Sequence, residues 1–139
     1  MRLAELVLDA GPLIALFRRD VPKHTQTVSG FQQLVASSTT LIVPSSIVFE
    51  VFKRMLYDCG SDEARIALQN MFDIFKIEYT TPTILLELDR IMTEMPNWNG
   101  SLEDANVAFL AIKSNLKAWT FNYRDLSAFQ DLEFWTPIA

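Results

Sequence analysis

Cysteine and histidine are almost missing from the sequence, which has one of each among 139 residues. A lone cysteine, Cys59, excludes an internal disulfide and any zinc site built from several cysteines. A lone histidine excludes a nuclease that uses two histidines as general acid and base, and also a metal site of the His-Glu-x-x-His type. A Ser-His-Asp triad would have to use His24, whose polar neighbours from Lys23 to Thr27 instead indicate a surface histidine at the start of a helix.

Basic residues are also few, since 12 Lys and Arg stand against 17 Asp and Glu and give a formal net charge of -5. A protein that grips nucleic acid by its overall charge needs clustered cations to neutralise phosphates. This composition argues against such a protein. If a phosphate is the substrate, the positive charge must be supplied locally.

Long apolar runs are absent as well. No stretch approaches the roughly 20 consecutive apolar residues of a membrane-spanning helix. The first apolar run is interrupted by Glu5 and Asp9, which makes it a poor signal peptide. We therefore expect a cytoplasmic protein with no membrane partner.

Hydrophobic residues make up 50% of the chain and aromatic residues 12%, enough for one compact domain over residues 1–139. Short apolar runs alternate with longer segments of helical periodicity, a pattern typical of an α/β fold with a parallel sheet. Strands are expected at residues 4–8, 40–44, 75–79 and 118–121. Residues 133–135 are a candidate for a fifth strand. Helices are expected from Pro12 through Phe17 and at residues 23–36, 45–56, 62–74, 82–93 and 103–115.

The helix expected at residues 45–56 shows the clearest amphipathic pattern. Ser45 or Ser46 would cap its N-terminus. Its apolar side chains fall on one stripe: Ile47, Val48, Val51, Phe52, Met55 and Leu56. The break after it is expected at Gly60-Ser61-Asp62.

Acidic or amide side chains recur where the expected strands end or the expected helices begin. In an open α/β sheet, ligands gather at the carboxyl ends of the strands. The residues concerned are Asp9, Glu50, Asp104, Asn122 and Asp125. Their recurrence is harder to explain by coincidence than any one of them, so the set is a candidate site.

Each of these residues also has a purely structural explanation. Asp9 can cap the helix that begins at Gly11-Pro12, and Asp104 matches the capping pattern Ser-x-x-Asp that starts at Ser101. Glu50 can form an i,i+4 surface pair with Arg54. Asn122 and Asp125 both suit a turn.

Four segments of the chain together resemble the PIN-domain ribonucleases, most closely the VapC-type toxins of bacterial and archaeal toxin-antitoxin pairs. They are "LVLDAGPLIALF", "IVPSSIVFEVFKRM", "SLEDANVAFLAIKSN" and "WTFNYRDLSAFQDLEFWTP", and they cover nearly the whole chain. The resemblance implies a single PIN-like domain with three layers, α/β/α, around a central parallel sheet of four or five strands. It also implies a metal-dependent endoribonuclease that acts as a toxin.

By motif, the resemblance assigns the catalytic, metal-binding acids to Asp9, Glu50 and Asp104, with Mg²⁺ or Mn²⁺ as cofactor. Many family members have Asp where this chain has Asn122, and Asp125 follows three residues later. An amide oxygen can coordinate a cation but lacks the charge to hold a second one strongly. One metal is therefore expected, with Asn122 and Asp125 as the less secure ligands.

Clustered carboxylates repel one another, and a hard divalent cation with oxygen ligands relieves that repulsion. The same cation would bridge an acidic protein and an acidic RNA substrate. Several basic residues could steer the RNA backbone: Arg18, Arg19, Lys53, Arg54 and Arg124.

The resemblance further implies two protein partners, a cognate antitoxin and a second copy of the chain in a homodimer. We expect Leu13, Phe17 and Phe31 to offer the antitoxin an apolar surface on the first helices. Two other functions stay open: a PIN-fold RNA-processing nuclease without a toxin role, and a non-catalytic interaction module, which Asn122 alone favours. A haloacid-dehalogenase phosphatase would need a second Asp where Gly11 stands.

Overall fold

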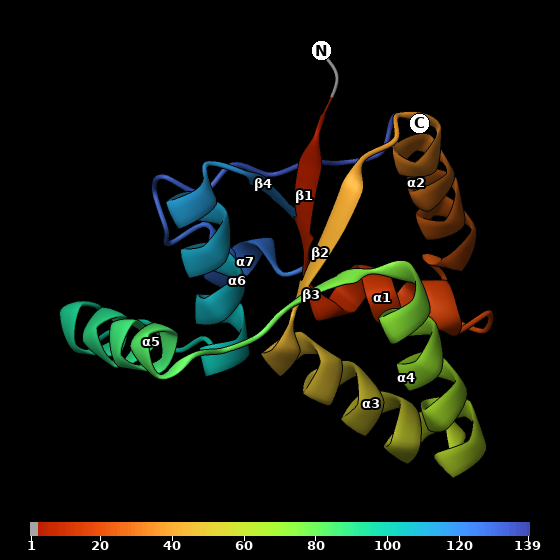
Figure 1. Ribbon diagram of the computed structural model, residues 1–139, viewed down its shortest axis with the longest axis horizontal. Coiled ribbons are helices and arrows are strands. Elements are labelled where there is room, and N and C mark those ends of the chain that lie inside the picture. Colours follow the sequence, from red (N-terminus) through yellow and green to blue (C-terminus); the bar gives the residue numbers. More distant parts are fainter. Residues whose placement is uncertain (1–2) are drawn as a thin grey trace.

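A parallel sheet of four strands forms the centre of the molecule, in a computed structural model that describes residues 3–139. The strands are β1 (Glu5–Leu8), β2 (Thr40–Pro44), β3 (Lys76–Glu78) and β4 (Lys117–Trp119), and their order across the sheet is β3-β2-β1-β4 (Figure 1). Every neighbouring pair is parallel. The α/β fold with a parallel sheet is confirmed. The fifth strand is not: residues 133–135 contribute one isolated bridge, between Ala118 and Phe134.

Seven helices flank this sheet in the described part of the chain, on both of its sides (Figure 1). They are α1 (Ala10–Phe17), α2 (His24–Ala36), α3 (Ser45–Cys59), α4 (Ser61–Ile74), α5 (Pro82–Glu94), α6 (Leu102–Ser114) and α7 (Tyr123–Leu126). The central strands are apolar and almost fully buried because helices cover both of their faces. Within residues 3–139, no helix is long and apolar enough to cross a membrane.

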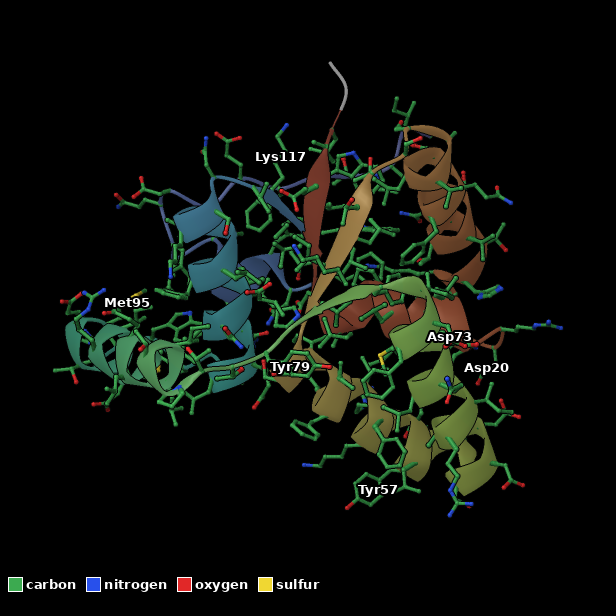
Figure 2. The ribbon with its side chains drawn as sticks, in the orientation of Figure 1. Asp20, Tyr57, Asp73, Tyr79, Met95 and Lys117 are labelled. Carbon is green, nitrogen blue, oxygen red and sulfur yellow. The ribbon has the colours of Figure 1, made fainter. Side chains whose placement is uncertain are left out.

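All four strands run in the same direction, so their carboxyl ends lie at one edge of the sheet. Figure 2 shows Lys117, the first residue of β4, at the far end from Tyr79, which follows β3. Helices α1 and α3 begin directly after β1 and β2 at the Tyr79 end. The residues that follow the strands are thereby gathered where ligands bind in this class of fold.

Helices α3 and α4 form an antiparallel pair that projects from the sheet, joined at Gly60 (Figure 1). Gly60 has a φ of 96°, a conformation that favours glycine, so the break predicted there is confirmed. Two details of the predicted α3 are wrong. It runs on to Cys59, and the residue before it is Pro44, with no side-chain cap from Ser45 or Ser46. Leu56 is also 38% exposed, whereas Met55 beside it is 1% exposed, so Leu56 lies at the edge of the buried stripe.

The prediction of an apolar docking surface on the first helices is wrong for two of its three residues. Leu13 is fully buried and Phe31 is 8% exposed, because α1 and α2 use these side chains to cover the sheet. The Phe31 ring packs against Trp119, with 4.8 Å between the ring centroids. Phe17 is half-buried. These side chains therefore belong to the core or its margin.

His24 is not a free surface residue either. It is half-buried, and its Nδ1 lies 2.7 Å from the carbonyl oxygen of Ala15. This contact ties the first residue of α2 to α1. The histidine therefore has a local structural role.

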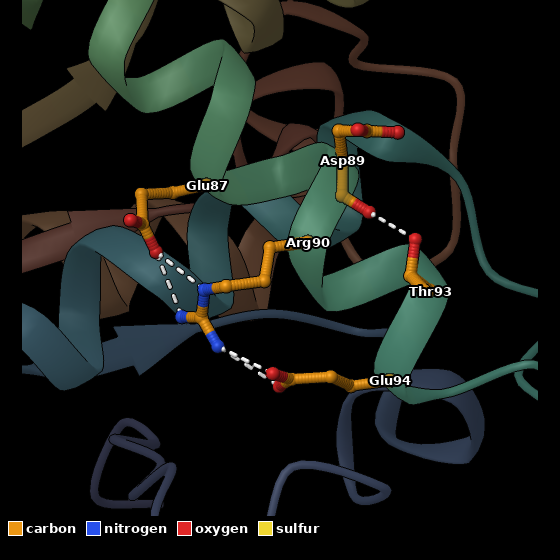
Figure 3. Close-up of polar contacts among 5 residues, drawn as sticks. All are labelled: Glu87, Asp89, Arg90, Thr93 and Glu94. Atoms are coloured by element: carbon orange, nitrogen blue, oxygen red, sulfur yellow. Dashed lines mark hydrogen bonds and ion pairs between the residues drawn. The ribbon is translucent and has the colours of Figure 1, made fainter.

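Helix α5 packs on α6 and otherwise stands apart from the body of the protein (Figure 1). Its buried residue is Leu88. On its exposed side, the Arg90 guanidinium pairs with Glu87 at 2.7 Å and with Glu94 at 2.8 Å, as Figure 3 shows. Such pairs at i,i+3 and i,i+4 support a helix locally, which suits one with little tertiary packing.

Candidate functional site

Asp9 lies directly after β1 and is 4% exposed. Its Oδ1 accepts a hydrogen bond from the Ala10 backbone N–H at 2.8 Å, which makes it the predicted cap of α1. Its Oδ2 accepts a second one from the Thr120 hydroxyl at 2.6 Å. Burial nevertheless raises the pKa of Asp9 to about 6, because desolvation of the carboxylate outweighs these two bonds.

Asp104 is the third residue of α6 and forms the predicted capping box with Ser101. The Asp104 backbone N–H donates to Ser101 Oγ at 3.1 Å. Asp104 Oδ2 also accepts from Nδ2 of Asn122 at 3.1 Å. Burial is the main reason that the pKa of Asp104 is raised, and the charges of Asp125 and Glu103 add to it. Capping therefore explains the residue's position in the helix without neutralising its charge.

Glu50 lies on α3 and does not form the surface pair predicted with Arg54. Within residues 3–139, Glu50 Oε2 is buried and has no hydrogen-bond partner. Arg54 instead lies 3.7 Å from Asp58, whose carboxylate also accepts Arg18 at 2.9 Å. Burial, followed by repulsion from Asp9 and Asp104, raises the pKa of Glu50 to about 7. A buried carboxylate oxygen without a partner is costly, so this atom calls for an explanation.

Asn122 links the two ends of the candidate site. Its backbone N–H donates to the Thr120 hydroxyl at 2.9 Å, and its Nδ2 donates to Asp104 Oδ2 and, at 3.0 Å, to Asp125 Oδ2. It is also the residue that caps α7. The amide nitrogen therefore faces the two carboxylates and bridges them.

The structure brings the five predicted residues together. Repulsion acts between Asp9 and Asp104, between Glu50 and both of them, and between Asp104 and Asp125. Among residues 3–139, no three acids, histidines or cysteines already stand in a grouping that could hold a metal ion. The chemistry of the donors still fits Mg²⁺ or Mn²⁺, which prefer carboxylate oxygens. An ion would also relieve both the repulsion and the partnerless Glu50 oxygen.

The predicted basic residues do not act as one group. Arg18 is committed to Asp20, at 2.6 Å, and to Asp58. Lys53 and Arg54 line a hollow of about 280 Å³ together with Glu50 and Glu103. Arg124 lies 3.5 Å from Asp125, and Arg19 is exposed after α1. Three of the five therefore lie beside a predicted acid: Lys53 and Arg54 beside Glu50, and Arg124 beside Asp125.

Two buried polar residues that support the acids were not predicted. Thr120, fully buried, joins Asp9 to the backbone of Asn122. Asn106, 3% exposed, donates through Nδ2 to Ser46 Oγ at 2.8 Å and so ties α6 to the first turn of α3, one turn before Glu50. The sequence did contain a signal that could have identified both residues, because each is a polar residue at a position that strand or helix periodicity predicts to be buried.

The sequence matches the PIN domain family over residues 6–132. This match spans most of the chain, so the protein belongs to the PIN domain family. No curated protein sequence matches it.

Solved structures with the same fold include several toxins. VapC20 of Mycobacterium tuberculosis, a toxin that cleaves the sarcin-ricin loop, is 17% identical, with a TM-score of 0.75 over 88% of this chain and 93% of its own. VapBC2 of Rickettsia felis, solved bound to a DNA fragment from its promoter, is 14% identical, with a TM-score of 0.75 over 94% and 97%. A toxin-antitoxin complex of Klebsiella pneumoniae is 21% identical, with a TM-score of 0.63 over 96% and 98%.

Proposed function

We propose that this protein is a metal-dependent endoribonuclease and the toxin of a toxin-antitoxin pair. The observation that carries the proposal is the meeting of Asp9, Glu50 and Asp104 from three separate parts of the chain. Burial and the charges of Asp9 and Asp104 raise the pKa of Glu50, and its Oε2 has no partner among the described residues. Membership of the PIN family and the fold shared with VapC20 support it. We also propose that the protein acts in the cytoplasm.

The three carboxylates would hold Mg²⁺ or Mn²⁺, with Asn122 and Asp125 at the margin of the site. When bound, the ion supplies charge that neutralises the phosphate and acidifies a water molecule. Thr120 and the Ala10 N–H fix both oxygens of Asp9, and Asn122 fixes one oxygen of Asp104. Glu50 Oε2, which has no such bond in the described chain, would complete the set of oxygen ligands for the ion.

Asn122 supports one ion rather than two. Its neutral amide donates hydrogen bonds to Asp104 and Asp125 where a fourth carboxylate would add a negative charge. The three clustered carboxylates, and not Asn122, argue against the non-catalytic alternative. An interaction module has no need of three mutually repelling carboxylates, whose burial costs stability.

A second protein is expected on the face of α3, α4 and β3. An apolar groove of about 500 Å³ lies there. The side chains of Phe49, Phe72 and Tyr79 line it and are 77%, 50% and 64% exposed. We assign this face, in place of Leu13 and Phe31, to a protein partner. Measurement of the mass of the purified chain in solution tests this assignment. The mass of a dimer would indicate that a second copy covers the face, and the mass of a monomer would leave the antitoxin as its partner.

The test of the enzymatic proposal is to incubate the purified protein with total cellular RNA and Mg²⁺ or Mn²⁺. An EDTA control and the Asp9→Asn variant run beside it. Discrete fragments that disappear in both controls are expected, and the band pattern identifies the class of RNA. Intact RNA in all reactions, with no Mn²⁺ binding by calorimetry, would favour the interaction module.

The toxin role needs a separate test in cells. Induced expression should arrest growth, and Asp9→Asn should not. Co-expression of a small protein encoded beside the gene should restore growth. A protein that cleaves RNA in vitro without arresting growth would instead be an RNA-processing nuclease.

A further inference from the structure

A pocket of about 340 Å³ lies among α1, the residues just before α2, Arg54 of α3 and Phe121. Its walls are mainly apolar, formed by Gly11, Ile14, Pro22 and Phe121, and two cations, Lys23 and Arg54, stand among them. We propose that this Phe121 pocket binds one unstacked base of a single-stranded RNA, beside the bond that is cut, while Lys23 and Arg54 bind the neighbouring phosphates. The inference rests on the proposed ribonuclease function and specifies its substrate.

The first argument is position, because the pocket's walls come from the same segments as the candidate acids. Phe121 lies between Thr120, which is bonded to Asp9, and Asn122, which is bonded to Asp104. Gly11 is two residues after Asp9. A base in the pocket therefore belongs to a nucleotide whose backbone passes the carboxylates.

Arg54 connects the Phe121 pocket with the hollow that contains Glu50. It lies one helical turn after Glu50 on α3 and lines both the Phe121 pocket and the hollow that contains Glu50. Its side chain is 57% exposed, and its ion pair with Asp58 is long, at 3.7 Å. Exposed pairs of this kind contribute little, so Arg54 can turn to a phosphate at small cost.

The second argument is the match of shape and charge. A volume of about 340 Å³ is near the small end of the usual range for ligand pockets, which suits one base. The half-buried Phe121 ring offers an aromatic wall. Lys23 Nζ lies 4.1 Å from the centre of that ring, so its ammonium group stands at the pocket, and it would exchange this cation-π contact for a phosphate when a base stacks on the ring. Apolar walls with a cationic rim match a base joined to phosphates.

This arrangement favours single-stranded RNA over a duplex. A paired base is stacked within its helix and cannot enter a side pocket, whereas bases in loops and single strands can. An apolar peptide side chain would also fit the walls, but it would leave Lys23 and Arg54 without an anionic partner. We therefore expect cleavage in loops or unpaired segments.

Gly11 keeps the pocket in its present shape. A Cβ added at Gly11 would lie 2.9 Å from Cδ2 of the Phe121 ring, too close for the ring to stay in place. Gly11→Ala should therefore displace the aromatic wall.

The test measures binding of a fluorescent single-stranded RNA octamer by anisotropy. It uses a Glu50→Gln background with Mg²⁺, in which no cleavage is expected. Phe121→Leu keeps the apolar bulk but removes the aromatic face, and it should weaken binding about 5- to 100-fold, as expected for the loss of one stacked base. Lys23→Ala should reduce the slope of log affinity against log salt by about 0.7. Lys76→Ala is the matched control, since Lys76 is an exposed lysine on β3, outside the pocket.

Lys23 is exposed, so Lys23→Ala tests the proposal even if Phe121→Leu fails to fold. In the active protein, Phe121→Leu should also change which nucleotides flank the cut. Unchanged octamer binding in both variants, or equal affinity for an RNA duplex, would overturn the pocket assignment while wild-type cleavage still stood. Loss of antitoxin binding without loss of RNA binding would assign the pocket to a protein side chain and equally overturn it. No cleavage by the wild type would remove the proposed function itself.

Discussion

At the scale of single residues, Asp9 has two roles that use different oxygen atoms. Oδ1 caps α1 through the Ala10 N–H, and Oδ2 receives the Thr120 hydroxyl. Each oxygen keeps a further lone pair, so these bonds and the proposed metal binding do not compete. The same holds for Asp104, which belongs to a capping box and is also held by Asn122.

The hydroxyl of Thr120 should matter to both stability and metal binding. Thr120→Val keeps the shape of the side chain but leaves Asp9 Oδ2 and the Asn122 N–H without a partner. We expect the free energy of unfolding to fall by about 1–3 kcal/mol and Mn²⁺ affinity to fall by about 10- to 100-fold. Chemical denaturation and calorimetry measure the two quantities. Thr120→Ser, which retains the hydroxyl, should restore most of the affinity; equal affinity in the Val and Ser variants would contradict the prediction.

The stability of the metal-free protein should fall as the pH rises through the carboxylate range. The pKa of Asp9 is about 6 and that of Glu50 about 7 in the folded state, above their ordinary values of 3.8 and 4.5. Between about pH 4 and 7 the folded state therefore binds protons that the unfolded chain has released, so raising the pH favours unfolding. In EDTA, the melting temperature should be higher at pH 5 than at pH 8.

Glu50→Gln is the matched variant for this prediction. It removes one buried charge, so it should raise the melting temperature at pH 8 and flatten the dependence on pH. A melting temperature that depends on pH as strongly in this variant as in the wild type would show that Glu50 is not the group responsible.

Sequence patterns located the acids because each stands at a strand end or near the start of a helix. They could not locate Thr120 or Asn106 as supporting residues, because those contacts join residues 111 and 60 positions apart. The prediction of a Glu50–Arg54 ion pair was wrong for a related reason. Helical spacing places Arg54 equally near Glu50 and Asp58, four residues to either side, and it does not reveal that Glu50 turns toward the other acids.

At the scale of elements, the periodicity of apolar residues predicted the helices and the central strands. The wrong predictions concern segments whose structure or burial depends on tertiary contacts. Residues 133–135 have the composition of a strand, yet they reach β4 through a single bridge. Leu13 and Phe31 look like excess apolar surface in a small protein. They are buried because α1 and α2 lie against the sheet, where Phe31 meets Trp119.

The contact between α2 and the sheet requires a glycine at position 30. A Cβ there would lie 2.6 Å from Cη2 of Trp119 and 2.9 Å from Cγ of Pro137. Trp119 is 1% exposed and has no room to move. Gly30→Ala should therefore destabilise the fold by about 1–3 kcal/mol, despite the better helix propensity of alanine. Urea denaturation measures the change, and a more stable variant would contradict the close contact.

At the scale of the whole molecule, a net charge of -5 means that an acidic protein would have to bind the proposed RNA substrate, which is also acidic. Part of that charge is concentrated at the carboxyl edge of the sheet, where Asp9, Glu50 and Asp104 repel one another. A divalent cation bound there would stabilise the folded state in proportion to the logarithm of its concentration.

Mn²⁺ should therefore raise the melting temperature at pH 8. At 100 times its dissociation constant, the expected gain is about 2.7 kcal/mol. The Asp9→Asn variant should lose most of this response, whereas Lys76→Ala, outside the site, should keep it. A thermal-shift titration measures the effect, and an equal response in Asp9→Asn would show that the ion binds elsewhere.

The placement of the tryptophans gives the protein an optical reporter of its own site. Trp119 directly precedes Thr120, and the indole N–H of Trp98 donates to the carbonyl oxygen of Asp125 at 2.9 Å. Two of the three tryptophans in the chain thus border the residues that hold or neighbour the acids. Intrinsic fluorescence should respond when an ion or a nucleotide rearranges those residues. Occupancy of the site can then be followed in real time, without a label.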